Sequence, residues 1–145
     1  MAEPSPHPPI PLDLPILDVL VAEDNPINQK VIDAMLRRQG WKVVLAANGK
    51  EAFERFQERP FHLILMDIQM PEIDGLQAAR LIRLEEHRKS RDSCRTPVIA
   101  LTAHASEAQH GQYLREGFDA VLTKPITLPS LLGEIRKVLG WKSTP

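Results

Sequence analysis

The stretch LILMDIQMP, from Leu63 to Pro71, runs from an apolar segment into a single carboxylate and then into a turn. No polar residue interrupts Leu63 to Met66, which is typical of a strand buried on both faces of a parallel sheet. Asp67 follows at the end of that strand. A carboxylate in this position is unfavourable unless another group pairs with it, so we expect Asp67 either to cap a turn or to take part in chemistry.

Four further segments of similar composition occur along the chain. They are short and rich in Val, Ile and Leu, and they span residues 16–22, 42–46, 97–101 and 120–123. Segments with apolar residues at helical spacing lie between and after them, and Leu128 to Leu139 shows such a stripe. Candidate helix caps mark the boundaries, namely Asn48, Ser106 with Gln109, Gly40, Gly117 and Gly140. Five alternations of strand and helix predict an α/β domain with a parallel sheet.

The proline content changes sharply after the first segment of the chain. Residues 1–15 contain six prolines, which remove backbone donors and favour extended conformations. We interpret this segment as a linker or tail, and a ligand for a proline-recognition domain is the alternative. Residues 16–141 are predicted to form one domain and residues 142–145 a C-terminal tail. The charged stretch from Glu85 to Arg95 is interpreted as a solvated helix end and loop.

The composition argues against several classes of function. With a formal net charge of -1, the chain has no overall positive charge to attract nucleic acid or an anionic membrane. One cysteine excludes an internal disulfide, and the five histidines do not combine with it at the spacing of a zinc site. No apolar run approaches the roughly 20 residues of a spanning helix, and the N-terminus lacks the features of a signal peptide. We expect a cytoplasmic domain without nucleic-acid or membrane contacts.

Polar residues follow four of the five predicted strands at the point where each strand ends. Glu23 and Asp24 follow the first strand, Asp67 the third, Thr102 the fourth and Lys124 the fifth. Each residue alone has an ordinary explanation as a cap, a turn residue or a solvated charge. Because the carboxyl ends of parallel strands meet at one edge, where such sheets bind ligands, the residues together predict one site.

The charges of this predicted site require a cation. Two carboxylates ~4 Å apart at an effective dielectric constant of about 20 repel by roughly 4 kcal/mol, so three would not stay ionised together without compensation. Lys124 could neutralise only part of that charge. Carboxylate oxygens with room for water suit Mg²⁺, and the combination with a hydroxyl and a lysine fits phosphoryl transfer. In such chemistry Asp67 would be the nucleophile and would form an acyl phosphate.

The chain resembles the receiver domain of two-component response regulators, most closely the receivers attached to hybrid sensor histidine kinases. The stretches that carry this resemblance are VLVAEDNPINQKV (19–31), LILMDIQMPEIDG (63–75), VIALTAHA (98–105) and LTKPI (122–126). The resemblance implies a doubly wound, flavodoxin-like fold, in which a five-stranded parallel sheet of order 2-1-3-4-5 has helices on both faces.

The resemblance also implies a ligand set for Mg²⁺. Asp67 would accept a phosphoryl group from a phosphohistidine. Asp24 and Asp67 would bind the metal directly, Glu23 would act largely through a water, and Gln69 would contribute its backbone carbonyl.

A second set of groups would face the phosphoryl oxygens. These are the backbone N–H groups of Ile68 and Ala103, the Thr102 hydroxyl and the Lys124 ammonium. The Lys124-Pro125 bond is similar to the family's cis peptide. The receiver would catalyse its own phosphorylation and dephosphorylation, and it would change conformation when phosphorylated.

The chain departs from the family pattern at one switch position. Receivers usually carry Tyr or Phe three residues before the lysine, and this ring rotates together with the threonine side chain. Here the two switch positions are Thr102 and Val121. A β-branched Val has few rotamers and no ring, which puts the aromatic part of the switch in question.

The partner implied by the resemblance is a histidine kinase core or a histidine phosphotransfer domain, docked near Asp67 against the first helix. The chain would be a receiver of a hybrid kinase, in the cytoplasmic part of a membrane-bound protein, or a free-standing regulator. The sequence gives no oligomeric state.

Two alternatives come from other classes of protein. A haloacid dehalogenase type of phosphatase also uses an aspartate nucleophile and Mg²⁺, but it needs a second aspartate where this chain has Gln69. The second alternative is a receiver-like module that binds partners without being phosphorylated. This alternative remains because Val121 replaces the usual aromatic switch residue.

Overall fold

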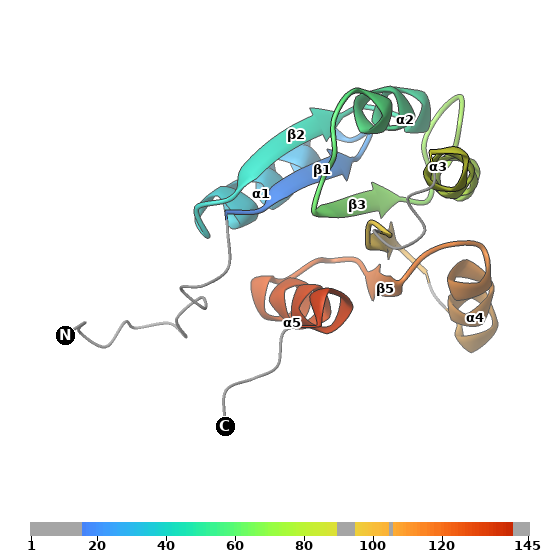
Figure 1. The fold of residues 1–145 in the computed structure, drawn as a ribbon. Helices are drawn as coiled ribbons and strands as arrows, with labels where there is room; N and C mark the ends of the chain where they lie inside the picture. Colours follow the sequence, from blue (N-terminus) through green and yellow to red (C-terminus); the bar gives the residue numbers. More distant parts are fainter. Residues whose placement is uncertain (1–15, 90–94, 105, 141–145) are drawn as a thin grey trace.

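The computed structural model describes residues 16–89, 95–104 and 106–140. The predicted linker of residues 1–15 and the predicted tail lie outside the described residues, as does residue 141. Five strands alternate with five helices (Figure 1). In chain order they are β1 (Asp18–Ala22), α1 (Pro26–Arg37), β2 (Lys42–Ala46), α2 (Gly49–Glu58), β3 (Leu63–Asp67), α3 (Gly75–Arg88), β4 (Val98–Thr102), α4 (Glu107–Arg115), β5 (Ala120–Thr123) and α5 (Leu128–Leu139).

The five strands form one parallel sheet of order β2-β1-β3-β4-β5, which confirms the predicted topology. β3 lies at its centre and is buried along its whole length. In the register of the sheet, Asp67 lies opposite Leu101, and Thr102 lies opposite Thr123. The strands therefore end close to one another along a single edge, which we call the carboxyl edge.

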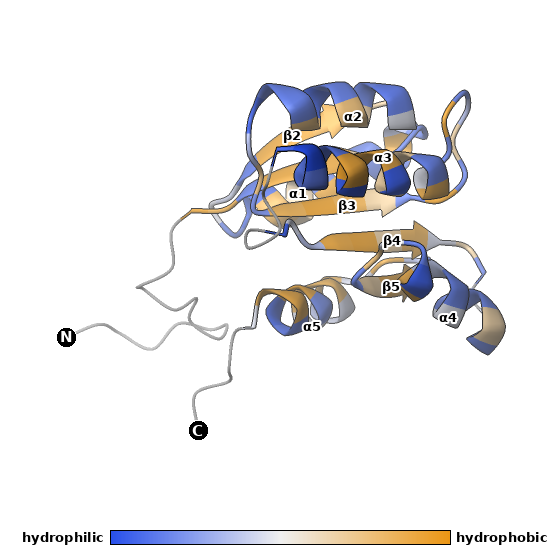
Figure 2. Cartoon of the chain, turned by 45° about the vertical axis from the view of Figure 1, so that its right-hand side comes forward, coloured by the Kyte–Doolittle hydropathy of each residue, from blue (hydrophilic) through white to orange (hydrophobic). Residues whose placement is uncertain are grey.

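Each face of the sheet is covered by its own apolar layer. Along β3, Ile64 and Met66 join the layer under α2, α3 and α4, whereas Leu63 and Leu65 join the layer under α1 and α5. Figure 2 shows the strands as predominantly hydrophobic, with hydrophilic residues on the outer surfaces of the helices. Burial on both faces explains why these strands are continuous apolar runs in the sequence.

Local sequence fixes where the helices begin and end. The predicted caps are confirmed at Asn48, at Ser106 with Gln109, and at Gly140, which has a left-handed backbone (φ 73°). A further capping box, Asp74 with Gln77, begins α3 and was not predicted.

The start of α3 is held tightly against the end of β3. A Cβ added at Gly75 would lie 2.3 Å from the carbonyl oxygen of Asp67 and 2.9 Å from Cα of Ile68. Only glycine permits this approach, and the Gly75 N–H donates to the Ile68 carbonyl at 2.9 Å. The start of α3 therefore holds the backbone that directly follows the Asp67 side chain.

The interpretation of Glu85–Arg95 as a solvated helix end and loop is wrong for its first residues. Glu85 and Glu86 are buried, with 5% and 4% of their surfaces exposed. Hydrogen bonds from Arg88, followed by those from Lys89, lower the pKa of Glu85 to about 2. Residues 90–94 lie outside the described residues. Within the described ranges, none of the helices combines the length and apolar character needed to cross a membrane.

Candidate functional site

Three carboxylates meet at the carboxyl edge of the sheet. Glu23 and Asp24 follow β1, and Asp67 ends β3. Glu23 is fully buried and Asp67 is 5% exposed, whereas Asp24 faces solvent. One carboxylate oxygen from each of the three lies within 4.8 Å of the others. The structure thus brings together the acidic residues that the sequence predicted as one site, and we call them the acidic triad.

The Lys124 ammonium lies between two members of the acidic triad. Its Nζ is 3.1 Å from Glu23 Oε1 and 3.2 Å from Asp67 Oδ2. The Lys124 N–H donates to the Thr102 carbonyl at 2.8 Å, which continues the pairing of β4 with β5. The Lys124-Pro125 bond is cis, as the sequence resemblance implied. The ends of β1, β3 and β5 therefore converge through one cation.

The pKa values of Glu23 and Lys124 are both raised, which indicates an excess of negative charge at the site. Burial, followed by the nearby charge of Asp67, raises the pKa of Glu23 even though Lys124 acts in the opposite direction. Burial lowers the pKa of Lys124, but its hydrogen bond to Glu23 and the charges of Asp67 and Glu23 outweigh this and raise it. One ammonium cannot neutralise three ionised carboxylates. The triad therefore has the charge and the hard oxygen ligands that suit a divalent cation such as Mg²⁺.

The backbone after Asp67 supplies donors that differ from those expected. The resemblance assigned the Ile68 N–H to the phosphoryl oxygens, but this group donates to the Leu101 carbonyl at 3.0 Å, as a continuation of the sheet. The Gln69 N–H, which was not predicted as a donor, donates to Asp67 Oδ1 at 3.3 Å. Gln69 is therefore the better-placed donor at this carboxylate. Its backbone carbonyl was predicted to bind the metal, and the contact of its N–H with Asp67 places this backbone beside the acidic triad.

Thr102 ends β4 beside this site, and its side chain is occupied. The Thr102 Oγ1 donates to the His104 carbonyl at 2.7 Å and accepts from the His104 N–H at 3.2 Å. The side chain is buried, with 6% of the residue exposed, whereas Ala103 is exposed in the loop. The hydroxyl is thus held in a turn at the start of the segment that leads to α4.

Val121 takes the place where the family pattern has an aromatic ring. It lies in β5, is 8% exposed and belongs to the same apolar cluster as Tyr113 and Phe118. Those two rings pack edge to face, with centroids 6.2 Å apart. The switch position is thus a small side chain within a packed cluster.

A second group of residues supports the site and was not predicted. The Gln29 side chain of α1 donates to the Glu23 carbonyl at 2.5 Å, and the Asn25 N–H donates to Glu23 Oε2 at 3.3 Å. An open depression of about 550 Å³ adjoins the triad and is lined by Asp24, Ile68, Gln69, Met70 and Asp74. It gives solvent, and any ligand, access to the Asp24 carboxylate.

Together the sheet order and this edge define a doubly wound α/β domain with an acidic, lysine-bridged site at the point where the strand order reverses. A family model for the response regulator receiver domain matches residues 19–136. The chain therefore belongs to the response regulator receiver domain family, and it is a receiver domain of two-component and phosphorelay signalling.

Individual comparisons agree with this assignment. The signal transduction histidine-protein kinase BarA of Escherichia coli K12 is 44% identical over 110 residues, which is 76% of this chain and 11% of BarA. The chain thus spans about a tenth of the length of the curated relatives it matches. Receivers of hybrid sensor histidine kinases are among these relatives.

Two solved structures are similar throughout the described fold. One is the receiver domain of the sensor histidine kinase PA1611 from Pseudomonas aeruginosa, which has magnesium in its active site cleft. It has a TM-score of 0.76 and 36% identity, and the match covers 87% of this chain and 99% of that one. The other is the Saccharomyces cerevisiae co-crystal of the phosphotransfer protein Ypd1 with the receiver of Ssk1. The match to it has a TM-score of 0.78 and 35% identity, and it covers 86% of this chain and 89% of that one.

Proposed function

We propose that Asp67 is the phosphoacceptor of this receiver and takes a phosphoryl group from a phosphohistidine. The observation that carries the proposal is the Lys124 ammonium, which bridges Glu23 and Asp67 at the end of the central strand. In the transfer, an Asp67 carboxylate oxygen forms a bond to phosphorus while the bond from phosphorus to the histidine nitrogen breaks, and the donor imidazole leaves. Two anions must approach each other in this step, so positive charge at the site is essential.

Each residue of the site has a role in this proposal. Asp24 and Asp67 would hold Mg²⁺ with the Gln69 carbonyl, and Glu23 would act through a water. The bound ion would neutralise charge between the carboxylates and the phosphoryl oxygens. Lys124 supplies a cation from the protein, which is already held 3.2 Å from Asp67.

The same geometry supports a conformational switch. To donate to a phosphoryl oxygen, the Thr102 hydroxyl must give up its hydrogen bond to the His104 carbonyl. Phosphorylation would therefore release the turn at His104 and change the loop that precedes α4. The Ala103 N–H lies in this loop and is proposed as a further phosphoryl donor. No movement of Val121 is needed for this exchange.

The proposed partner is a histidine kinase core or a histidine phosphotransfer domain that docks against α1. Ile27 and Val31 of this helix are 72% and 45% exposed although both are large and apolar. Beside them a hollow of about 210 Å³ extends to Lys124 and Pro125 and is partly lined by Val31. A helix of the partner resting on this apolar strip would bring its phosphohistidine to the carboxyl edge.

A direct comparison of two donors tests this docking surface. Ile27→Ala and Val31→Ala should slow transfer from a phosphorylated histidine phosphotransfer domain by about tenfold or more, as expected for interface anchors, and leave transfer from acetyl phosphate unchanged. Leu84→Ala is the control, because Leu84 is 64% exposed but lies on α3. Equal rates from the protein donor for all three variants would contradict the proposal.

The intact acidic triad and Lys124 favour phosphorylation over the alternative of a module that only binds partners. We propose that the chain works in the cytoplasm as a receiver of a hybrid histidine kinase. Incubation with acetyl phosphate and Mg²⁺ should add the mass of one phosphoryl group. EDTA and Asp67→Asn should each prevent the gain, whereas a gain that survives Asp67→Asn would overturn the assignment.

A further inference from the structure

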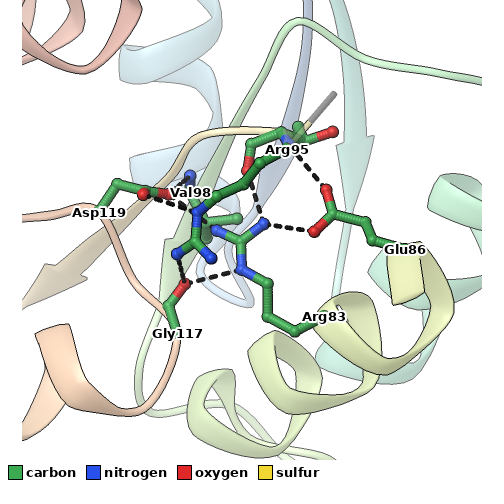
Figure 3. Close-up of polar contacts among 7 residues, drawn as sticks. Arg83, Glu86, Arg95, Val98, Gly117 and Asp119 are labelled. Carbon is green, nitrogen blue, oxygen red and sulfur yellow. Dashed lines mark hydrogen bonds and ion pairs between the residues drawn. The ribbon is translucent and has the colours of Figure 1, made fainter. Parts of the chain in front are cut away.

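The Arg83 guanidinium makes four hydrogen bonds at the edge of the sheet opposite the acidic triad (Figure 3). Its Nε donates to the Gly117 carbonyl at 3.0 Å, and its Nη2 donates to Asp119 Oδ2 at 2.7 Å. Its Nη1 donates to Glu86 Oε1 and to the Thr96 carbonyl, each at 2.8 Å. One side chain of α3 thus contacts the start of β4 and the turn between α4 and β5.

The carboxylates around Arg83 bind backbone as well as side chains. Glu86 accepts the Thr96 N–H at 2.7 Å, and Asp119 accepts the Val98 N–H at 2.9 Å. Arg95 adds a second cation, 3.1 Å from Asp119. Two arginines therefore face two carboxylates, so the charges balance. The Arg83 and Glu86 side chains are only 16% and 5% exposed, and hydrogen bonds between charged groups are strong in such surroundings.

These contacts fix the carboxyl end of α4. Arg80, one turn before Arg83 in α3, pairs with Glu116 at 2.7 Å, directly after the last residue of α4. Gly117 has a left-handed backbone (φ 121°), and a Cβ there would lie 3.3 Å from Cγ of Arg83. Asp119 then enters the sheet, where its N–H donates to the Val98 carbonyl at 2.8 Å. We call Arg80 and Arg83, with Glu116, Gly117 and Asp119, the α3 anchor.

The amino end of α4 has no comparable set of contacts among the described residues. Residues 106–110 are exposed, and Tyr113 is the buried residue of the helix. This end begins with the Ser106 capping box and follows the His104 turn that Thr102 holds. The two ends of α4 are therefore attached in different ways.

We propose that the α3 anchor holds the carboxyl end of α4 in place, so that structural change starting at Asp67 moves only its amino end. Glu116 to Asp119 then form the fixed pivot about which the helix tilts. This inference rests on the proposed phosphorylation, because the release of His104 by Thr102 provides the displacement. The α3 anchor itself is a property of the unphosphorylated protein and can be measured separately.

Amide hydrogen exchange of the unphosphorylated chain tests the anchor. Glu116, Phe118 and Asp119 donate backbone hydrogen bonds near the pivot, and His110 donates one to Ser106 at the amino end. Arg83→Lys keeps the charge but cannot span the same acceptors, and Arg80→Met removes the exposed link. Exchange at Phe118 and Asp119 in the first variant, and at Glu116 in the second, should rise by about tenfold, with His110 unchanged.

Two controls distinguish local loosening at the end of α4 from a loss of stability of the whole domain. The Leu65 amide of β3 reports global opening and should not change in either variant. Arg88→Met is the matched control, since Arg88 pairs with Glu85 within α3 and should leave the α4 amides unaffected. Wild-type exchange rates at Phe118 and Asp119 in Arg83→Lys, or at Glu116 in Arg80→Met, would overturn the anchor.

Phosphorylation of the same proteins tests the pivot. In the wild-type chain, acetyl phosphate with Mg²⁺ should alter exchange from Thr102 to His110 and leave Phe118 and Asp119 unchanged. In Arg83→Lys the change should spread to Phe118 and Asp119. An equal change at both ends of wild-type α4 would overturn the pivot. Absence of phosphorylation would instead refute the proposed function, while exchange in the unphosphorylated protein still decides whether the anchor exists.

Discussion

Replacement of Asp67 by asparagine should stabilise the metal-free domain. Asp67 faces the carboxylates of Glu23 and Asp24 within 4.8 Å, and its ammonium partner Lys124 at 3.2 Å. At an effective dielectric constant of about 20, each repulsion is worth ~3.5 kcal/mol and the attraction ~5 kcal/mol, which leaves ~2 kcal/mol of net repulsion. Solvent screens the exposed Asp24, so we expect the free energy of unfolding to rise by roughly 1–2 kcal/mol in Asp67→Asn.

Urea denaturation in EDTA and in Mg²⁺ measures this effect. Mg²⁺ at a hundred times its dissociation constant should stabilise the wild-type domain by about 2.7 kcal/mol, because it binds the folded state. The Asp67→Asn variant lacks one charged ligand, so Mg²⁺ should stabilise it much less than it stabilises the wild-type domain. Asp33→Asn is the control, since Asp33 pairs with Arg37 on the surface of α1 and should cost under about 0.5 kcal/mol without changing the Mg²⁺ effect. A metal-free Asp67→Asn less stable than wild type, or equal stabilisation of both by Mg²⁺, would refute the reasoning.

Four further predictions concern other residues. Gly75→Ala should destabilise the domain by roughly 1–3 kcal/mol and slow phosphorylation, because its Cβ would clash with the Asp67 backbone. In thermal unfolding, Gly133→Ala should instead stabilise α5 by about 0.5–1 kcal/mol, since its Cβ meets nothing within 4 Å. Glu85 has a pKa lowered to about 2 from 4.5, so its contribution to stability is present above pH 4.5 and is lost as the pH falls toward 2. Glu85→Gln should lack that part of the acid transition, and an unchanged acid profile would contradict this. Lys124→Gln should slow phosphorylation by acetyl phosphate by about 10²-fold through the loss of charge stabilisation, and a wild-type rate would argue against this role.

The strands and the site at their ends could be predicted because both depend on local pattern. Strands buried on both faces are continuous apolar runs, and β3 extends through Leu63–Asp67 as that pattern indicates. Once the strands are parallel, their carboxyl ends must meet, and this brings Asp67 to Lys124, which lies 57 residues further along the chain. The side-chain types at those ends then limit the chemistry.

The α3 anchor could not be predicted in the same way. Arg83 contacts Asp119, which is 36 residues away, and the contact depends on how α3 lies against the sheet. In the sequence, Glu85 and Glu86 resemble an exposed charged helix end, although both are buried by pairing with arginines.

The backbone group that donates to Asp67 could not be predicted from the sequence to the exact residue. Sheet pairing continues one residue past β3, so the Ile68 N–H is used by Leu101 and the Gln69 N–H turns toward the carboxylate. Such a shift by one residue depends on the register between β3 and β4, which motif spacing alone does not determine.

The most direct test of the account is to locate the phosphoryl group after transfer from a phosphorylated histidine phosphotransfer domain in Mg²⁺. Borohydride reduces an acyl phosphate to an alcohol, so peptide mapping after reduction identifies the modified residue. We predict that residue 67 alone is converted to homoserine, and that Asp67→Asn abolishes the conversion. A reduced residue elsewhere in the chain, or transfer to histidine with residue 67 unmodified, would contradict the central claim.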